Sequence, residues 1–169
     1  MKLSVLNDEQ NNPWYAKGLK FTCTQCGNCC TGGPGFVWIS KEEIVRLGEF
    51  LKISPEEVVE QYCRKVAGRW SLKESRNSRD GAYDCIFLRE DGAKRGCSIY
   101  PVRPLQCRTW PFWESNLKSP ESWKLASRNC HGMDRGRLFS QPEMESLRDA
   151  EDWPRNPPTS APKSEKTPR

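Results

Sequence analysis

Hydrophobic residues recur at helical spacing in two adjacent segments, 40–51 and 54–66. Each segment begins with a serine and has a glutamate three residues later. This is the capping-box pattern, in which the two side chains satisfy backbone N–H groups at the start of a helix. Apolar residues then return every three or four positions, as on the buried face of an amphipathic helix. The spacing predicts two consecutive helices and places Cys63 on the buried face of the second.

Alternation with a period of two is limited to short segments, so any strands are expected to be short. The segments 18–23 and 36–40 each predict one strand. "AYDCIFL" and "CSIY" flank an Asp-Gly turn at 91–92, which predicts a hairpin. Cys85 and Cys97 are expected near its two arms.

Prolines and serines set the later elements. Proline interrupts regular structure, so only a single helical turn is predicted from Pro104, and it carries Cys107. Ser119 and Ser140 precede two further short helices. From Pro154 onward, proline, serine, threonine and lysine dominate, which predicts disorder.

The composition favours a small domain that needs cross-links or metal. Only 36% of the 169 residues are hydrophobic and the mean hydropathy is −0.82, so little core is available. We expect an α+β fold, a small cysteine-rich domain with short helices and short strands organised around one or two metal sites. The expected parts are an N-terminal extension (1–17), the metal-binding domain (18–150) and a disordered tail (151–169).

The charge and the absence of apolar runs limit the expected partners. The net charge is +5, with both signs interspersed, which argues against nucleic acid as a partner. No stretch is long enough to span a membrane, and the N-terminus is too short and polar for a signal peptide. The expected compartment is the cytoplasm, where thiols stay reduced. A protein partner is left open.

Nine cysteines are present, and helical spacing assigns Cys63 to the core. Eight is twice four, and four thiolates complete one tetrahedral zinc site or one iron–sulfur cluster. A framework of four disulfides is the alternative, and a reducing compartment argues against it. The eight candidate metal ligands are Cys23, Cys26, Cys29, Cys30, Cys85, Cys97, Cys107 and Cys130.

The spacing of the first four candidates suggests how they bind. Cys23, Cys26 and Cys29 form C-x2-C-x2-C, the spacing of bacterial ferredoxin loops, which favours a 4Fe-4S cluster; zinc also accepts C-x2-C pairs. Cys30 directly follows Cys29. In an extended segment, neighbouring side chains point to opposite sides, so Cys30 is expected to serve a second site. A single larger cluster that uses both thiols is the alternative.

At these residues the chain resembles a known family. "FTCTQCGNCC", "CIFL", "CSIYPVRPLQCRTWPF" and "NCHG" are similar to the CxxCxxCC cysteine-cluster proteins, described as zinc- or iron-chelating. Bacterial flagellin lysine N-methylases share this cysteine pattern. The resemblance runs from Phe21 to Gly132 and implies that the eight cysteines are metal ligands. One departure is His131, where the family often has proline.

The resemblance also implies the competing function, a component of a protein lysine N-methyltransferase. Whether the chain is an enzyme is left open, since a closed four-thiolate site is typical of structural metals. The implied ligand is a metal ion or a cluster, iron–sulfur or zinc, with a role in electron transfer or metal handling.

Two arginines flank Cys107 and are candidates for balancing the negative charge of a thiolate site. Arg103 and Arg108 are therefore expected to support the cofactor, with surface salt bridges as the alternative. His131, the only histidine, is expected to be exposed.

Overall fold

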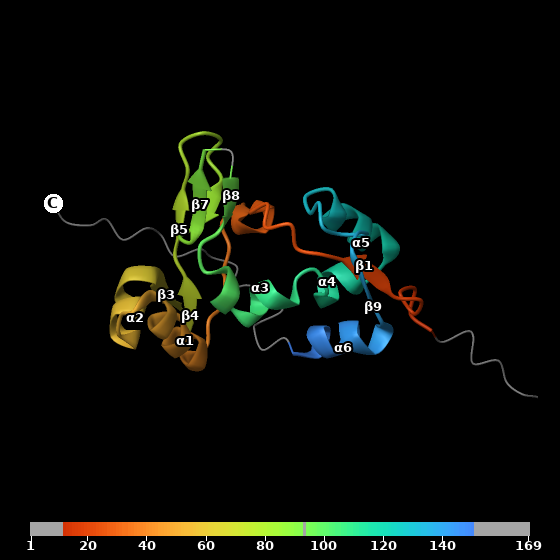
Figure 1. Cartoon of the computed structure of the whole chain (residues 1–169), viewed down its shortest axis with the longest axis horizontal. Helices are drawn as coiled ribbons and strands as arrows, with labels where there is room; N and C mark the ends of the chain where they lie inside the picture. The colour runs from red at the N-terminus through yellow and green to blue at the C-terminus, as the bar shows by residue number, and fades with distance from the viewer. Residues whose placement is uncertain (1–11, 93, 151–169) are drawn as a thin grey trace, which may run out of the picture. The chain divides into compact units, whose positions relative to one another are not determined.

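The computed structural model describes residues 12–92 and 94–150, which divide into two units of mixed helices and short antiparallel strands (Figure 1). Unit 1 combines the described residues up to Thr24 with Pro111–Ala150, and unit 2 is Gln25–Trp110. The α+β expectation is confirmed. The predicted tail, 151–169, and most of the predicted N-terminal extension lie outside the described residues.

Both predicted capping boxes are present in unit 2. In α1 (Lys41–Leu51), the Ser40 side chain accepts a hydrogen bond from the Glu43 N–H, and the glutamate side chain accepts one from the Ser40 N–H. In α2 (Pro55–Tyr62), Ser54 and Glu57 repeat this exchange. Each box satisfies N–H groups that the first turn of a helix leaves free, so both helices begin where the sequence predicts.

The second helix ends earlier than predicted, which corrects the placement of Cys63. Cys63 begins strand β3 (Cys63–Val66), which pairs with β4 (Arg69–Leu72). The turn between them uses positive φ at Ala67 and Gly68, 47° and 81°. The apolar spacing fits both a helix and a hairpin, and the turn favours the hairpin. The predicted burial is confirmed, because Cys63 is only 4% exposed.

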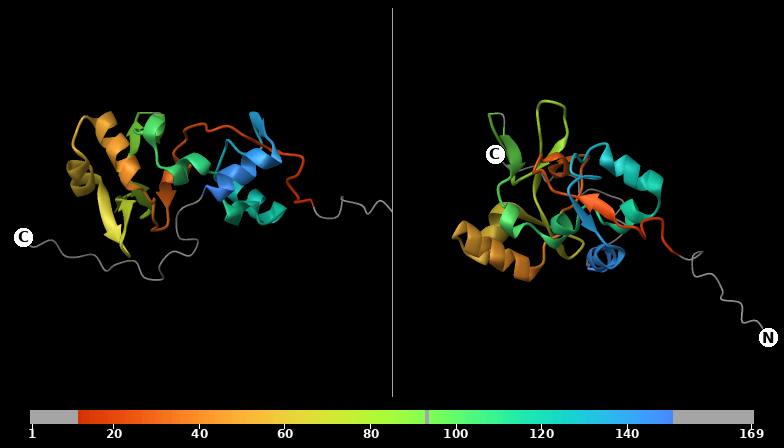
Figure 2. Two further views of the ribbon diagram at one scale, coloured as in Figure 1. Left: turned by 90° about the horizontal axis from the view of Figure 1, so that it is seen from below. Right: turned by 45° about the vertical axis from the view of Figure 1, so that its right-hand side comes forward.

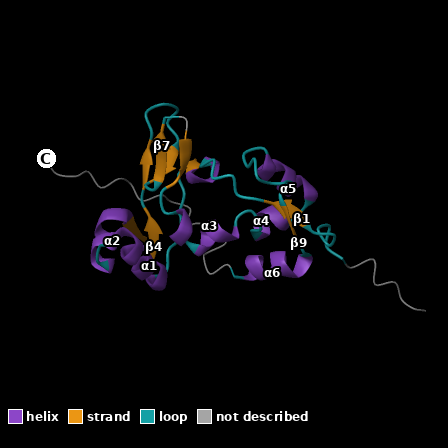
Figure 3. Cartoon of the chain, viewed as in Figure 1, coloured by secondary structure: helices purple, strands orange, loops and turns teal. Residues whose placement is uncertain are grey.

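The remaining strands of unit 2 form two small sheets, drawn in orange in Figure 3. One has the order β2-β6-β5, with bounds Thr31–Gly32, Tyr83–Cys85 and Glu74–Arg76. The other is the hairpin of β7 (Leu88–Asp91) and β8 (Lys94–Cys97). The predicted hairpin is thus correct in its Asp91-Gly92 turn, whereas its second arm, predicted at 97–100, lies earlier, at Lys94–Cys97. Its first arm was misassigned, because Cys85 ends a strand of the other sheet.

The segment 36–40 is not a strand but contributes one isolated bridge, Trp38 to Ser71. Its backbone bonds to β4 through the Val37 carbonyl and the Ile39 N–H. After β8, the chain forms the short helices η3 (Tyr100–Val102) and α3 (Leu105–Thr109), the latter being the helical turn predicted to carry Cys107. The core of unit 2 is mainly aliphatic: Ile39, Ile44, Leu47, Val58, Cys63, Leu72, Phe87 and Ile99.

Unit 1 is built from segments distant in sequence, as both views of Figure 2 show. Strand β1 (Leu19–Phe21) pairs antiparallel with β9 (Arg137–Phe139). A short η2 helix (Asn28–Cys30) belongs to unit 2, whereas the helices of unit 1 are α4 (Glu114–Leu117), α5 (Pro120–Ser127) and α6 (Gln141–Asp149).

Aromatic side chains fill the core of unit 1. Phe112 is 1% exposed and contacts the rings of Phe21, Trp123 and Phe139, with centroids 4.6 to 5.9 Å apart. Trp123 also donates to the Asp134 carboxylate at 2.8 Å, so its polar group is satisfied. Across the described ranges, no helix combines the length and apolar character needed to cross a bilayer.

Candidate metal centre

Residues 25–30 form a tight loop against the β7–β8 hairpin. Gly27 has φ of 72°, and a Cβ there would come within 2.7 Å of Leu88 Cδ1. A Cβ at Gly96 of β8 would come within 3.0 Å of the Gln25 carbonyl oxygen. Gly27 therefore requires glycine, because it is left-handed and close to Leu88, and a side chain at Gly96 would displace the Gln25 carbonyl.

Arg95 of β8 anchors the same loop. Its Nη1 donates to Asn28 Oδ1 at 3.0 Å, and its Nε lies 2.8 Å from Glu90 Oε1 on β7. The loop that carries Cys26, Cys29 and Cys30 is therefore fixed beside the strand that ends at Cys97.

The cysteine doublet lies in a helical turn, which corrects the expectation that its thiols diverge. Cys29 and Cys30 end the η2 turn, and their Sγ atoms are 4.0 Å apart. Opposite orientation of neighbouring side chains holds for extended backbone only. The two thiols thus face each other, which removes the reason to assign them to separate sites.

A hydrogen bond links the two thiols of the doublet. The hydrogen bond with Cys30 and, less strongly, the positive charges of Arg103 and Arg95 together lower the pKa of the exposed Cys29 thiol to about 7. The same hydrogen bond, together with burial, raises the pKa of Cys30. One thiol therefore ionises readily and the second is held protonated beside it.

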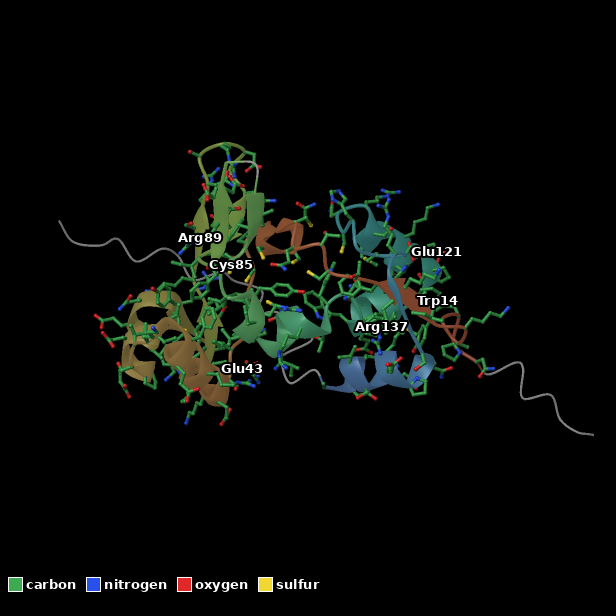
Figure 4. The ribbon with its side chains drawn as sticks, in the orientation of Figure 1. Trp14, Glu43, Cys85, Arg89, Glu121 and Arg137 are labelled. Atoms are coloured by element: carbon green, nitrogen blue, oxygen red, sulfur yellow. The ribbon has the colours of Figure 1, made fainter. Side chains whose placement is uncertain are left out.

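Three further cysteines, each on a separate element, are close enough to shift the pKa values of this pair or of one another. Burial raises the pKa of Cys85 to about 11, and neighbouring Cys97 and Cys29 add to the effect. Burial also raises the pKa of Cys107, with Cys85, Cys29 and Cys97 contributing. Figure 4 labels Cys85, beside which other sulfur atoms are drawn. Five thiols from four segments of unit 2 thus interact with one another.

The predicted arginines take different positions. Arg103 donates to the Tyr100 carbonyl at 2.8 Å and lies over the Tyr100 ring, and its charge acts on Cys29 and Cys107. Arg108 instead contacts Glu43 Oε1 at 3.4 Å. Arg95, which lies near candidate ligands in the sequence but was not assigned this role, supplies positive charge close to Cys29.

Three other cysteines belong to unit 1 or to the aliphatic core of unit 2. Cys23 and Cys130 belong to unit 1, where the Thr22 N–H bonds to the Gly132 carbonyl at 3.0 Å and aligns their segments. His131 is exposed, as expected. Cys63 packs in the aliphatic core of unit 2.

The chemistry of the donor set fits a thiophilic metal. Thiolate sulfur is the preferred donor for zinc and for iron–sulfur clusters. A tetrahedral zinc site with Zn–S distances of about 2.3 Å has sulfur atoms about 3.8 Å apart, close to the separation in the doublet. In the two ranges described, no three Cys, His, Asp or Glu side chains are already arranged to hold one ion. The cysteines therefore match a thiophilic metal in the type of their donor atoms and in their proximity.

Comparison with known proteins agrees with this chemistry. The model of the CxxCxxCC family, described as a "Putative zinc- or iron-chelating domain", matches residues 22–131. An uncharacterized protein of Methanocaldococcus jannaschii, MJ0661, is 34% identical over 99 residues, which cover 58% of this chain and 48% of that protein. The chain thus spans about half the length of this relative. No solved structure is significantly similar. Because the family model covers well over half of the chain, including all eight candidate ligands, this protein belongs to the CxxCxxCC family.

Proposed function

We propose that the protein binds a thiophilic metal through its clustered cysteines, with unit 2 supplying most of the ligands. The observation that carries the proposal is the convergence of Cys29, Cys30, Cys85, Cys97 and Cys107 in unit 2. Crowded thiols are difficult to ionise at the same time because their negative charges repel. A bound cation offsets this repulsion when it replaces their protons. Cys26, on the same loop, completes the proposed ligands of this unit.

Arginine charge supports this function. Several thiolates around one divalent ion carry net negative charge, which is costly to bury without nearby cations or hydrogen bonds. Arg103 and Arg95 supply positive charge close to Cys29. Both are also held by bonds of their own, so their guanidinium groups do not need to reorganise when the site binds.

Zinc is the metal favoured by the doublet, because two thiols 4.0 Å apart span one edge of a zinc tetrahedron. An iron–sulfur cluster, 4Fe-4S first, is the second candidate and is favoured by the C-x2-C-x2-C spacing. A closed thiolate site supports a structural or metal-handling role with zinc, and electron transfer with iron–sulfur.

The deciding experiment is purification of the full chain under nitrogen, followed by elemental analysis and an absorption spectrum. Zinc bound without colour supports the first candidate, and iron with sulfide and a broad visible band supports the second. Protein that retains neither metal, and takes up neither after reconstitution under reducing conditions, would overturn the proposal.

The resemblance to flagellin N-methylases implies a second activity, lysine methylation, for this chain or for a larger assembly that contains it. The test is transfer of a labelled methyl group from S-adenosylmethionine to lysine in candidate protein substrates. Labelled protein above the level of a Cys85→Ser variant would support this activity, and equal labelling would refute a role of the cysteines in it.

A further inference from the structure

Three of the described helices begin with the same S-x-x-E capping box, but their glutamates have different surroundings. Glu57 of α2 is exposed and Glu143 of α6 is partly exposed, whereas Glu43 of α1 is only 6% exposed. A buried carboxylate is costly unless its oxygens are satisfied. The burial of Glu43 therefore points to a role beyond capping its own helix.

The two oxygens of the Glu43 carboxylate have different partners, one within the capping box and one outside α1. Oε2 accepts the Ser40 N–H at 3.0 Å and completes the capping box. Oε1 accepts the backbone N–H of Leu105 at 2.7 Å and lies 3.4 Å from Arg108 Nη2. Leu105 is the first residue of α3, the helix that carries Cys107.

Helix α3 lacks a cap of its own. Its N-cap is Pro104, which makes no side-chain capping bond, so Glu43 does from a distant helix what a serine does for α1. A second anchor lies on Gln106, whose side chain accepts the Trp38 N–H at 2.8 Å and donates to the Phe36 carbonyl at 3.2 Å. This short helix is thus held at its first two residues by groups outside it.

We infer that Glu43 is a positioning residue for Cys107: its carboxylate fixes the start of α3 and thereby holds this thiol among the other cysteines. The inference rests on the proposed metal-binding function for its consequence, but the positioning itself is a property of the metal-free chain. Figure 4 labels Glu43 and Cys85 within unit 2.

The test compares Glu43→Ala with Glu57→Ala in the full chain. Both variants lose a glutamate from the same type of capping box, but the Glu57 carboxylate is exposed on α2, where it completes only its own box. The first readout is the rate at which iodoacetamide alkylates Cys107 in metal-free reduced protein, measured by peptide mass spectrometry. Cys63, buried in the core, is the internal reference for global unfolding.

We expect the Cys107-to-Cys63 rate ratio to rise about tenfold in Glu43→Ala, because an unpaired N–H at the start of α3 releases that helix. In Glu57→Ala the ratio stays within about twofold of wild type. Equal ratios in the two variants would overturn the inference. If Glu43→Ala does not fold, Glu43→Asp replaces it, since its shorter side chain keeps the charge but cannot reach both N–H groups. Cys107 and Cys63 rising in parallel in that variant would likewise overturn it.

The second readout is zinc release to a chromophoric chelator, expected to be about tenfold faster in Glu43→Ala than in Glu57→Ala. Equal release rates, with the alkylation ratio raised, would refute the link between Glu43 and the metal while leaving the positioning supported. A wild-type chain that binds neither zinc nor iron would instead refute the proposed function, and the alkylation ratio would still decide the positioning role.

Discussion

The two units solve the problem of a small core differently. Unit 1 packs Phe112 against three other aromatic rings and holds two candidate cysteines. Unit 2 has a mainly aliphatic core, strands of two to four residues in three small sheets, and the other six candidates.

Large rings bury much apolar surface per residue, so unit 1 gains stability from packing alone. Two-stranded sheets with short strands are marginal by themselves, and a metal joins distant segments without needing more core. If the proposed site binds metal, unit 2 is therefore the unit expected to gain more stability from it.

The largest expected effect is on metal content. Replacing Cys85 and Cys107 together by serine removes two proposed ligands of unit 2 and should lower bound metal to less than about a tenth of wild type. The matched double variant Cys23→Ser/Cys130→Ser in unit 1 should lower it less. Elemental analysis of both proteins checks this, and equal losses would show that the two units do not differ as metal sites.

Metal removal should affect the units unequally. Metal at a hundred times its dissociation constant adds about 2.7 kcal/mol of stability, which corresponds to roughly a hundredfold in hydrogen-exchange protection. We expect this loss in segments 25–32 and 83–97 after chelation, with 137–149 little changed. Hydrogen exchange with mass spectrometry measures both, and a uniform loss would contradict the distinction.

A glycine substitution in unit 1 should have the opposite effect, destabilising unit 1 rather than unit 2. A Cβ at Gly132 would lie 1.9 Å from the Thr22 carbonyl oxygen, so Gly132→Ala should destabilise unit 1 by about 3 kcal/mol. Gly33→Ala in unit 2 is the control, because open space surrounds that position. Urea unfolding monitored by hydrogen exchange should show a lower free energy of unfolding for the first variant and almost no change for the second.

The smallest expected effect concerns the ninth cysteine. Cys63→Ala removes a buried sulfur from the core and should cost about 1 kcal/mol of unfolding free energy without changing metal content. Chemical denaturation and elemental analysis check the two parts. Loss of metal in this variant would mean that Cys63 is a ligand and that the core assignment is wrong.

Signals carried by a few neighbouring residues predicted the structure well. The S-x-x-E boxes, the proline-limited turn at Cys107 and the Asp-Gly turn all appear where expected, because each depends on local backbone bonding. The β3–β4 hairpin was missed, since its apolar spacing also fits a helix and its Ala67-Gly68 turn is a weaker signal. Which strand Cys85 joins depends on partners distant in sequence, and local patterns do not carry that information.

The candidate site shows the same division. Counting and spacing identified the cysteines, but the facing of Cys29 and Cys30 depends on the turn that Gly27 begins. Arg95 and Glu43 owe their roles to contacts with residues more than 60 positions away, at Asn28 and Leu105. A capping glutamate gives the same sequence pattern whether it is exposed or buried, so only the fold distinguishes Glu43 from Glu57.

The pairing of β1 with β9 has a consequence for biosynthesis. Phe21 emerges from the ribosome long before Arg137, by on the order of ten seconds at typical elongation rates. All of unit 2 is translated within that interval, whereas unit 1 cannot close until its second strand exists. The nascent chain therefore acquires its cysteine-rich half first, and the aromatic half is completed last.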